Sequence, residues 1–246
     1  MKDLFSGHAQ EYATFRPHYP PELYHFLFKY VRAFDHAWDA GTGNGQAAVV
    51  LAGRFGMVTA TDISEKQLAQ AKRLSNITYK VGGEVSALPD QSIDLVTVAQ
   101  AVHWFDRENF YAEVNRVARP GAIIAIWGYG LFQVDESIDP LMTTFYQSVV
   151  GSYWDPERKL IDDEYRSIDF PFDEIPAERF AISLEWDMAV LEGYLNTWSA
   201  VQKHIKVNKT NPVAGLMNQL LPLWGSGKWL VQFPVFLRLG RVNPNA

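Results

Sequence analysis

The feature that most constrains the fold is a glycine-rich turn in the run from Trp38 to Gln46, which reads WDAGTGNGQ. Its three glycines are two residues apart, and apolar residues stand on both sides of the run. This pattern indicates a short buried strand that joins a helix through a sharp turn. Glycine adopts positive φ without strain and has no Cβ, so a ligand can approach the main chain closely. The sequence therefore predicts a nucleotide-binding turn within a βα unit.

Two acidic residues refine this prediction. Asp62 follows the apolar run 57–61, which predicts the next strand, and a carboxylate there could accept hydrogen bonds from both hydroxyls of a ribose. Asp39 precedes the first glycine and gives the pattern D-x-G-x-G-x-G in place of the dinucleotide fingerprint G-x-G-x-x-G. Such a carboxylate suits a ligand that brings no phosphate to the turn, because it could hold an ammonium group or a water. A glycine-rich turn by itself is as often only a tight turn.

Composition limits the other possibilities. The chain has 246 residues, 48% of them hydrophobic, which is enough for one α/β domain with a full core. A net charge of −6 without clusters of Lys and Arg argues against nucleic-acid binding. There is no cysteine, so disulfides, thiolate zinc sites and cysteine nucleophiles are excluded, and we expect no metal site. No stretch has the length and apolarity of a signal peptide or membrane span, so we expect a cytoplasmic protein without membrane partners.

Alternation of strand-like and helix-like segments predicts a parallel sheet for the first half of the chain. The predicted elements are a helix over 22–34, the strand before the glycine turn, a helix over 47–55, strands over 57–62, 77–81, 93–99 and 122–127, and helices that Ser64 (over 64–74) and Asp106 cap.

Past Trp127 the pattern changes. Asp139-Pro140 and Asp155-Pro156 each predict an N-cap with proline at the first helical position, so residues 129–176 should form a helical cap. Residues 180–186 alternate apolar and polar and predict a strand that resumes the sheet, while 231–242, with Pro234 inside, predict a closing edge strand. Asp187 and Asn211 should begin two helices between them. We expect one domain over 1–246, with parts at 1–34, 35–128, 129–176 and 177–246.

Four of these segments together resemble a class I S-adenosylmethionine-dependent methyltransferase of the type 11 group. They are the turn Asp39–Gln46, the acid Asp62, the turn Leu88-Pro89-Asp90 and the strand entry Arg119-Pro120-Gly121. The resemblance implies an α/β fold with a Rossmann-like, seven-stranded, mostly parallel sheet, helices on both faces and a small helical cap insertion. It also implies S-adenosyl-L-methionine as the cofactor. The match is strong over residues 1–128 and weaker beyond them.

The resemblance also assigns cofactor contacts to residues of this chain. The three glycines of the turn would permit close backbone approach, Asp39 would anchor the methionine end, and Asp62 would hold the ribose. Glu84 stands where the family usually bonds the adenine amino group, or it is a solvated loop residue; the acid that the family often has two positions later is here Ser86. The full predicted cofactor set is Tyr12, Asp39, Gly41, Gly43, Gly45, Asp62, Ile63, Glu84, Val85, Gln100 and Ala101.

A narrower resemblance concerns the methyl acceptor. The leader from Phe5 to Pro20 and the segments 101–106, 193–199 and 233–242 are similar to trans-aconitate methyltransferase-like proteins. This similarity implies a small-molecule acceptor that is methylated on oxygen, with a carboxylate preferred. Arg16 could then pair with a carboxylate of the cofactor or of the substrate, because its planar guanidinium suits bidentate contact.

His103 is, with Arg16, the predicted catalytic residue. It follows the fourth predicted strand, at the carboxyl edge where ligands of open α/β sheets bind. Together with Trp104 it could wall the sulfonium pocket by cation–π contact, or it could accept a proton from a hydroxyl acceptor. A purely structural histidine is the remaining interpretation.

Three functions stay open at this point. The favoured one is methylation of a small-molecule carboxylate by a monomer or homodimer, and the second is base-assisted methylation of a hydroxyl group. The third is a regulatory or assembly protein that binds the cofactor without turnover. A nucleotide-dependent oxidoreductase is disfavoured, because it would need G-x-x-G after the first glycine pair and Gly45 stands one position early.

Overall fold

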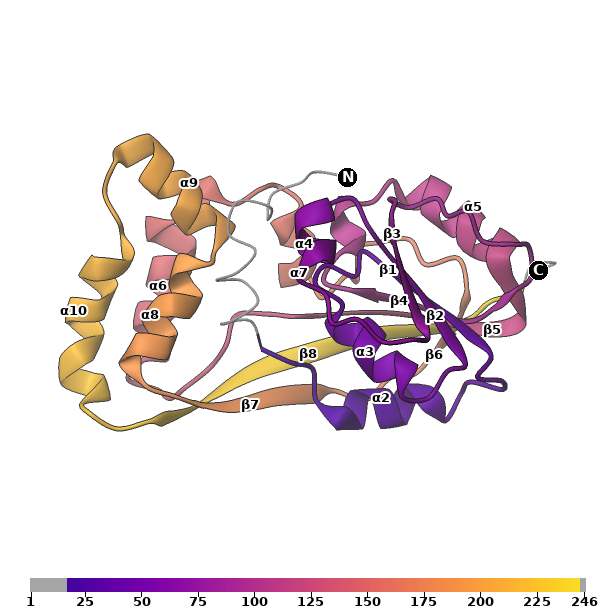
Figure 1. Ribbon diagram of the computed structural model, residues 1–246. Coiled ribbons are helices and arrows are strands. Elements are labelled where there is room, and N and C mark those ends of the chain that lie inside the picture. Colours follow the sequence, from indigo (N-terminus) through magenta and orange to yellow (C-terminus); the bar gives the residue numbers. More distant parts are fainter. Residues whose placement is uncertain (1–16, 244–246) are drawn as a thin grey trace.

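The computed structural model describes residues 17–243, which form a sheet-centred body and a helical lobe (Figure 1). The strands are β1 (His36–Ala40), β2 (Met57–Asp62), β3 (Ile77–Val81), β4 (Ile93–Ala99), β5 (Ala118–Tyr129), β6 (Asp173–Ile175), β7 (Phe180–Trp186) and β8 (Trp229–Arg241). They lie in one sheet in the order β3-β2-β1-β4-β5-β8-β6, with β7 also beside β8. Strands β1 to β5 are parallel, and β8 runs antiparallel to its neighbours. The Rossmann-like, mostly parallel sheet is confirmed, with eight strands in place of seven.

The central strands are covered on both faces, as a parallel sheet requires. Every residue of β4 except the last is buried. Neighbouring residues of a strand point to opposite faces, so Leu95 joins one hydrophobic cluster and Val96 the other. The first cluster contains apolar side chains of α2 (Pro21–Phe28) and α3 (Gln46–Ala52), and the second contains those of α5 (Arg107–Val117). Helices therefore bury both faces of the sheet, as predicted.

Local sequence signals located several helix starts correctly. Ser64, Asp106 and Asp187 each accept a hydrogen bond from the main-chain N–H three residues further on, at 3.3, 3.3 and 2.9 Å. They stand directly before α4 (Glu65–Ala69), α5 and α8 (Met188–Asn196). Asn211 also accepts the N–H of the first residue of α10 (Val213–Trp224), at 2.9 Å. Each of these bonds satisfies a helix N–H that has no partner within its helix.

Two helices end at least five residues earlier than predicted. α2 ends at Phe28 and α4 ends at Ala69, five or six residues before the predicted ends. Arg73 donates to the carbonyl of Leu68 at 3.0 Å and so satisfies an acceptor in the last turn of α4. Apolar residues past the helix ends still pack on the core: Phe34 contacts Phe55 with ring centroids 5.1 Å apart. The periodic pattern thus marked buried positions correctly but overestimated how far the helix continues.

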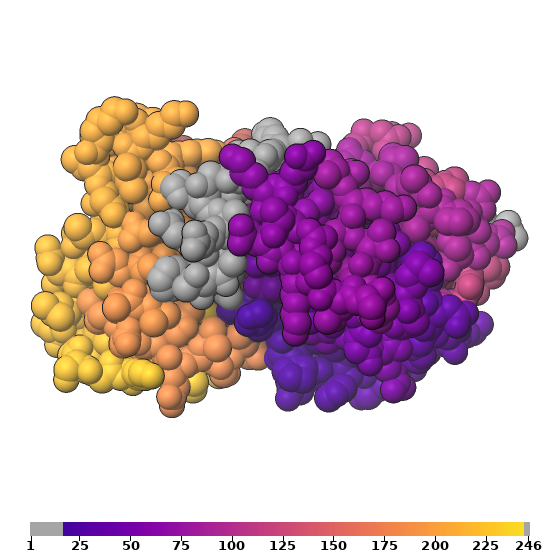
Figure 2. Space-filling model, viewed as in Figure 1, coloured from indigo at the N-terminus to yellow at the C-terminus, as the bar shows by residue number. Residues whose placement is uncertain are grey.

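Helices after β5 build a lobe at one end of the molecule. They are α6 (Asp139–Thr144), the π-helical turn η2 (Phe145–Val149), η3 (Gly151–Tyr153), α8, α9 (Ser199–Asn208) and α10, whereas α7 (Arg158–Asp162) lies against the sheet-centred body, where Ile161 joins the second hydrophobic cluster (Figure 1). The orange and yellow surface of α8 to α10 stands opposite the indigo and purple core (Figure 2). The lobe therefore combines helices of the predicted cap with helices of the C-terminal part. No helix among residues 17–243 is long and apolar enough to span a bilayer.

The predicted N-caps Asp139 and Asp155 are wrong. Asp139 is instead the first residue of α6 and accepts the N–H of Val134 at 2.7 Å. Asp155 forms an ion pair with Lys203 Nζ of α9 at 2.6 Å, and α7 begins only at Arg158. A local main-chain N–H binds the Asp139 carboxylate and a distant lysine binds that of Asp155, so neither caps a helix as the Asp-Pro pattern predicts.

The prediction of a closing edge strand over 231–242 is also wrong, because β8 is internal. β5 pairs with its residues 235–241, while on its other side β7 pairs with 229–235 and β6 with 239–241. The carbonyl of Pro234 accepts the N–H of Gly130, just past the end of β5. In an antiparallel ladder the N–H and C=O of one residue point to the same side. The N–H that proline lacks would therefore point to the side of Gly130, which lies beyond the last residue of β5, so proline is tolerated at this position of the strand.

Candidate cofactor and acceptor site

The glycine turn runs from the end of β1 to the start of α3. Gly41, Gly43 and Gly45 have φ angles of +68°, +56° and +83°, which residues with a side chain rarely adopt. A Cβ at Gly41 would lie 2.5 Å from the Cβ of Ala101, and a Cβ at Gly45 would collide with the phenol of Tyr79. A Cβ at Gly43 would meet nothing within 4 Å. Gly43 is thus the glycine with an open main-chain face, whereas the other two let the turn pack against its neighbours.

Asp62 connects this turn to the end of β2. Its Oδ2 accepts the N–H of Gly43 at 2.8 Å, and its Oδ1 accepts the N–H of Ser64 at 2.8 Å. β1 and β2 are adjacent and parallel, so the turn and the carboxylate reach the same edge of the sheet. One hydrogen bond therefore joins Asp62, the residue predicted to bind the ribose, to Gly43, whose main chain is open on one face.

Asp39 lies beneath the turn and is fully buried. Its Oδ2 accepts the hydroxyl of Thr42 at 2.5 Å and its Oδ1 accepts the hydroxyl of Thr97 at 2.7 Å. Burial raises the pKa of Asp39 to about 6, although both hydroxyl bonds act in the opposite direction. These contacts attach the turn to β4. A direct contact between Asp39 and a cofactor stays a prediction.

The loop after β3 carries the predicted adenine contacts. Glu84 is half-buried and Val85 is exposed, and Ile63 after β2 packs toward this loop, 3.7 Å from where Gly83 would carry a Cβ. Ser86 is turned away: its N–H and its hydroxyl both donate to Glu113 Oε1 of α5, at 2.8 and 2.6 Å. Ser86, where the family resemblance led us to expect an acid, is therefore bonded to a carboxylate of α5.

Gln100 and Ala101 follow β4 at the same edge of the sheet. Gln100 has a φ of +54°, a costly conformation for a residue with a side chain, and its Nε2 donates to the carbonyl of Tyr129 at 3.1 Å. Its Oε1 is buried and has no hydrogen-bond partner in the described part of the chain. Ala101 packs its Cβ against Gly41. Strain and an unsatisfied polar atom at one residue are typical of a binding site.

His103 lies in the short 3₁₀ turn η1 (Val102–Trp104) and is 4% exposed. Its Nδ1 is 2.8 Å from the hydroxyl of Tyr165, and the two rings are stacked with centroids 5.9 Å apart. Burial, followed by the nearby Arg158 guanidinium, lowers the pKa of His103 to about 3. The imidazole is therefore neutral at physiological pH and a weak proton acceptor.

A cavity of about 50 Å³ separates this edge of the sheet from the helical lobe. That volume holds a few waters or a group as small as a carboxylate. Like Gln100 Oε1, the indole Nε1 of Trp104 is buried without a hydrogen-bond partner among residues 17–243. The lining residues are Gln100, His103, Trp104, Trp154, Asp155, Arg158, Ile161, Tyr194, Trp198 and Ser199.

The sequence analysis missed most residues after β5 that line or support this cavity. Tyr165 was not assigned to the site, yet it bonds the lining residue His103 from 62 residues away. Trp154 and Arg158 were not singled out, although a cation four residues after a tryptophan is a signal for stacking. Two predicted site residues, Tyr12 and Arg16, lie outside the described residues.

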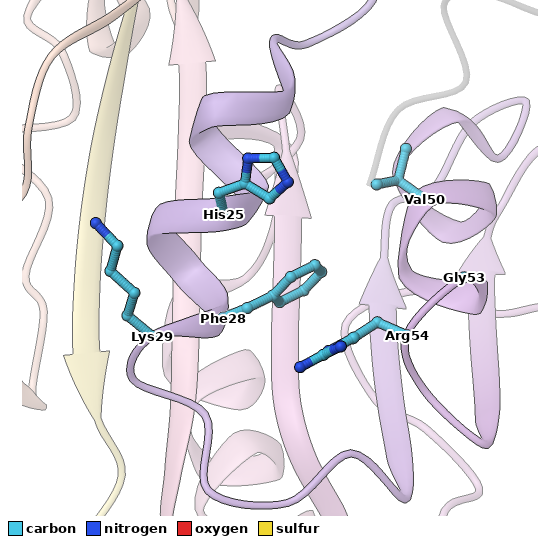
Figure 3. A pocket seen from close by; sticks show the side chains of 6 residues that line it. All are labelled: His25, Phe28, Lys29, Val50, Gly53 and Arg54. Carbon is cyan, nitrogen blue, oxygen red and sulfur yellow. The ribbon is translucent and has the colours of Figure 1, made fainter.

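A larger hollow of about 480 Å³ lies elsewhere, between α2 and α3 (Figure 3). His25, Phe28 and Arg54 line it, and none of the predicted site residues does. Arg54 stacks over the ring of Phe34 at 4.8 Å, so its guanidinium already has a partner. This hollow is formed by the outer sides of two covering helices, away from the carboxyl edge of the sheet. We therefore place the candidate site at the glycine turn and the smaller cavity.

Comparison with known proteins agrees with this geometry. Residues 38–126, from within β1 to within β5, match the family model described as a methyltransferase domain. A Dictyostelium discoideum protein named as a methyltransferase is 35% identical over 97% of this chain and 95% of its own length. A methyltransferase of Aspergillus candidus is 33% identical over 52% of this chain, and this chain spans 46% of that protein.

Solved structures extend the match to the whole fold. A structure from Anaeromyxobacter dehalogenans, described as a type II methyltransferase, superposes with a TM-score of 0.87 and 40% identity, covering 94% of this chain and 100% of that one. A sheet with a glycine turn and an acid after its second strand, joined to a helical lobe, defines a class I methyltransferase architecture. The chain belongs to the S-adenosylmethionine-dependent methyltransferases.

Proposed function

We propose that this enzyme transfers the methyl group of S-adenosylmethionine to a carboxylate oxygen of a small molecule. The observation that carries the proposal is the cavity beside the glycine turn, which holds the cation Arg158 and a neutral His103. A carboxylate is ionised at neutral pH and needs a counter-charge rather than a base. A hydroxyl acceptor would need a group that takes its proton during attack.

The cofactor would be held along the carboxyl edge of β1, β2 and β3. The open main chain at Gly43 fits close approach, and Asp62 beside it would hold the ribose. Ile63, Glu84 and Val85 would enclose the adenine. Asp39 would act from beneath the turn, where it fixes Thr42, and would offer negative charge to the methionine ammonium. Gln100 and Ala101 would close the site on the β4 side.

When bound, the cofactor supplies a methyl group activated by a positively charged sulfur. The residues of this chain would contribute alignment and exclusion of water, which account for most of the rate in such a displacement. Trp104, Trp154 and Trp198 supply much of the apolar part of the cavity wall. Arg158 and His103 would supply the polar contacts that orient the acceptor.

Base-assisted methylation of a hydroxyl group is the alternative. It requires His103 to accept a proton, and a pKa lowered to about 3 makes that step unfavourable at neutral pH. The Nδ1 of the ring is also engaged by Tyr165. Both observations favour the carboxylate.

The test is an activity screen with matched acceptors. The enzyme is incubated with S-adenosylmethionine and small carboxylic acids, with the primary amides and alcohols of the same skeletons as controls. We expect S-adenosylhomocysteine release with the acids alone and a product that carries one extra methyl group and is cleaved by mild alkali, as esters are. Turnover of the alcohols, with an alkali-stable product, would refute the carboxylate assignment. Cofactor binding without turnover of any acceptor would favour the regulatory interpretation.

A further inference from the structure

Arg158 is held in a fixed orientation at the cavity. Its guanidinium lies over the ring of Trp154 at 4.9 Å and over that of Tyr146 at 5.5 Å. Its Nε donates to the Tyr146 hydroxyl at 2.8 Å, and this hydroxyl donates to Asp162 Oδ1 at 2.6 Å. The side chain is 19% exposed. Two ring contacts and one hydrogen bond therefore hold the guanidinium before any ligand arrives.

The two terminal nitrogens of Arg158 have no hydrogen-bond partner within residues 17–243. The nearest carboxylate oxygen, on Asp162, is 3.7 Å from Nε, too far for a hydrogen bond. Asp155 also lines the cavity, but its carboxylate is paired with Lys203 at 2.6 Å. The paired N–H groups of a guanidinium match the two oxygens of a carboxylate. The cavity thus contains a preoriented cation whose fork is not used by the described part of the protein.

A second donor is set by Tyr165. This phenol is fully buried, burial raises its pKa above the ordinary range, and His103 Nδ1 is its one hydrogen-bond partner in the part of the chain described. A buried hydroxyl proton without an acceptor is costly, so the phenol donates to Nδ1. The imidazole proton must then be on Nε2. His103 accordingly presents an N–H donor, and no lone pair, on its remaining nitrogen.

Tyr165 is itself firmly placed. Its φ of +59° is an unfavourable conformation that surrounding contacts must hold. Arg238 Nη1 donates to its carbonyl at 3.0 Å, and the same guanidinium is paired with Glu174 at 2.9 and 3.0 Å. Arg238 of β8 therefore holds Tyr165, and Tyr165 in turn fixes which nitrogen of His103 carries the proton.

We infer that Arg158, the Nε2–H of His103 and the unpartnered indole N–H of Trp104 form an anion subsite that anchors the methyl acceptor, and that Tyr165 is the residue that positions His103 for it. This inference rests on the proposed function. The three donors belong to residues that line a carboxylate-sized cavity, and the Nε2–H tautomer leaves no free acceptor on the imidazole; Gln100 Oε1 is an unpartnered acceptor in the same lining. A cage for a cationic acceptor, the rival use of these aromatic rings, would place two positive charges together, because Arg158 already occupies Trp154 and Tyr146.

The experiment measures ligand binding rather than turnover. The wild-type protein, saturated with S-adenosylhomocysteine, is titrated with aconitate, citrate, succinate and benzoate, followed by tryptophan fluorescence and calorimetry, with the methyl esters as neutral controls. The variants are Arg158→Gln, Arg158→Lys and the control Arg166→Gln, an arginine on the same insertion that is 68% exposed. We expect at least one acid to bind, an affinity loss of about 10-fold or more in Arg158→Gln, a smaller loss in Arg158→Lys, and none in Arg166→Gln.

Two results would overturn the subsite: no binding of any of the four acids by the wild type, or equal affinity in wild type and Arg158→Gln. A separate titration with S-adenosylhomocysteine distinguishes failure of the subsite from failure of the proposed function. If the wild type does not bind S-adenosylhomocysteine, the proposed function fails, whatever the acids do.

The role of Tyr165 is tested by ¹⁵N NMR of the histidine rings, with the His103 signal assigned by its loss in His103→Gln. We expect the Nε2–H tautomer in the wild type and a mixture in Tyr165→Phe. An Nδ1–H tautomer in the wild type would contradict the inference.

Discussion

Asp39 offers the sharpest test of the electrostatics of the glycine turn. It is fully buried, and burial raises its pKa from an ordinary 3.8 to about 6. A carboxyl group with a higher pKa in the folded state binds its proton more tightly there. Its stabilising contribution is therefore complete below about pH 4 and is lost as the pH rises through about 6. A shift of about two units corresponds to about 3 kcal/mol of unfolding free energy.

The perturbation is Asp39→Asn, which keeps an oxygen acceptor for one of the two threonine hydroxyls but cannot ionise. Urea denaturation at pH 4 and pH 7 gives the unfolding free energy of the wild type and the variant. Wild-type stability should fall between these pH values by about 2.4 kcal/mol more than that of the variant, because part of the total of about 3 kcal/mol is already lost at pH 4. The hydrogen bonds lost in the variant are absent at both pH values, so they cancel in this difference. Glu185→Gln, on the exposed side of β7, is the control and should keep the wild-type pH dependence.

Cofactor binding provides a second measurement on the same residue. An ammonium group placed beside Asp39 would lower its pKa, so binding at pH 6, where the carboxyl is about half protonated, should release up to about half a proton per molecule. Calorimetry in buffers of different ionisation enthalpy measures this release, which should vanish in Asp39→Asn. Parallel loss of stability in wild type and variant between pH 4 and pH 7 would refute the buried, proton-binding carboxyl. Proton release that persists in the variant would refute its proximity to the ammonium.

Other predictions concern neighbouring residues. Asp62→Ala should weaken S-adenosylmethionine binding by about 1.5 to 3 kcal/mol, measured by titration; unchanged affinity in a folded variant would mean that this carboxylate does not hold the ribose. Gly41→Ala should lower the melting temperature more than Gly43→Ala, because of these two only a Cβ at residue 41 would collide with a neighbour. Gly43→Ala should instead weaken cofactor binding, since the new methyl group would stand on the open main-chain face. With an acceptor in hand, Arg16→Ala should lower kcat/KM by about 10-fold to 100-fold and His103→Ala only modestly; a loss confined to His103→Ala, with disappearance of an ionisation near pH 6.5, would favour the hydroxyl acceptor.

The pH dependence of stability adds one more expectation. The pKa of His103 is lowered to about 3, so its unfolded form takes up a proton below about pH 6.5 while the folded form does not. Its contribution to stability should therefore decrease as the pH falls through 6.5. His103→Gln should remove that part of the acid sensitivity in denaturation curves, and an unchanged acid profile would show that the ring is more accessible to protons than its burial indicates.

Residues close together in the sequence carried the information that predicted the sheet and the turn. The strand β4 is a short, mostly apolar run, and the glycines that follow β1 adopt the positive φ angles that their lack of a side chain allows. Ser64 and Asp106 cap helices because the N–H groups they bind are only three residues away. Such features depend on neighbours within one turn or one strand, so a single sequence suffices to find them.

Packing between distant segments decided the rest. Asp155 pairs with Lys203 and does not cap a helix. β8 is internal because β6 and β7 both pair with the side of it that faces away from β5. His103 meets Tyr165 across 62 residues, and this contact, with the burial around it, determines that the imidazole is neutral and which of its nitrogens faces the cavity. A titratable group takes its properties from whatever surrounds it in space, so the sequence could identify His103 as a candidate while only the tertiary structure could indicate that it is a hydrogen-bond donor rather than a base.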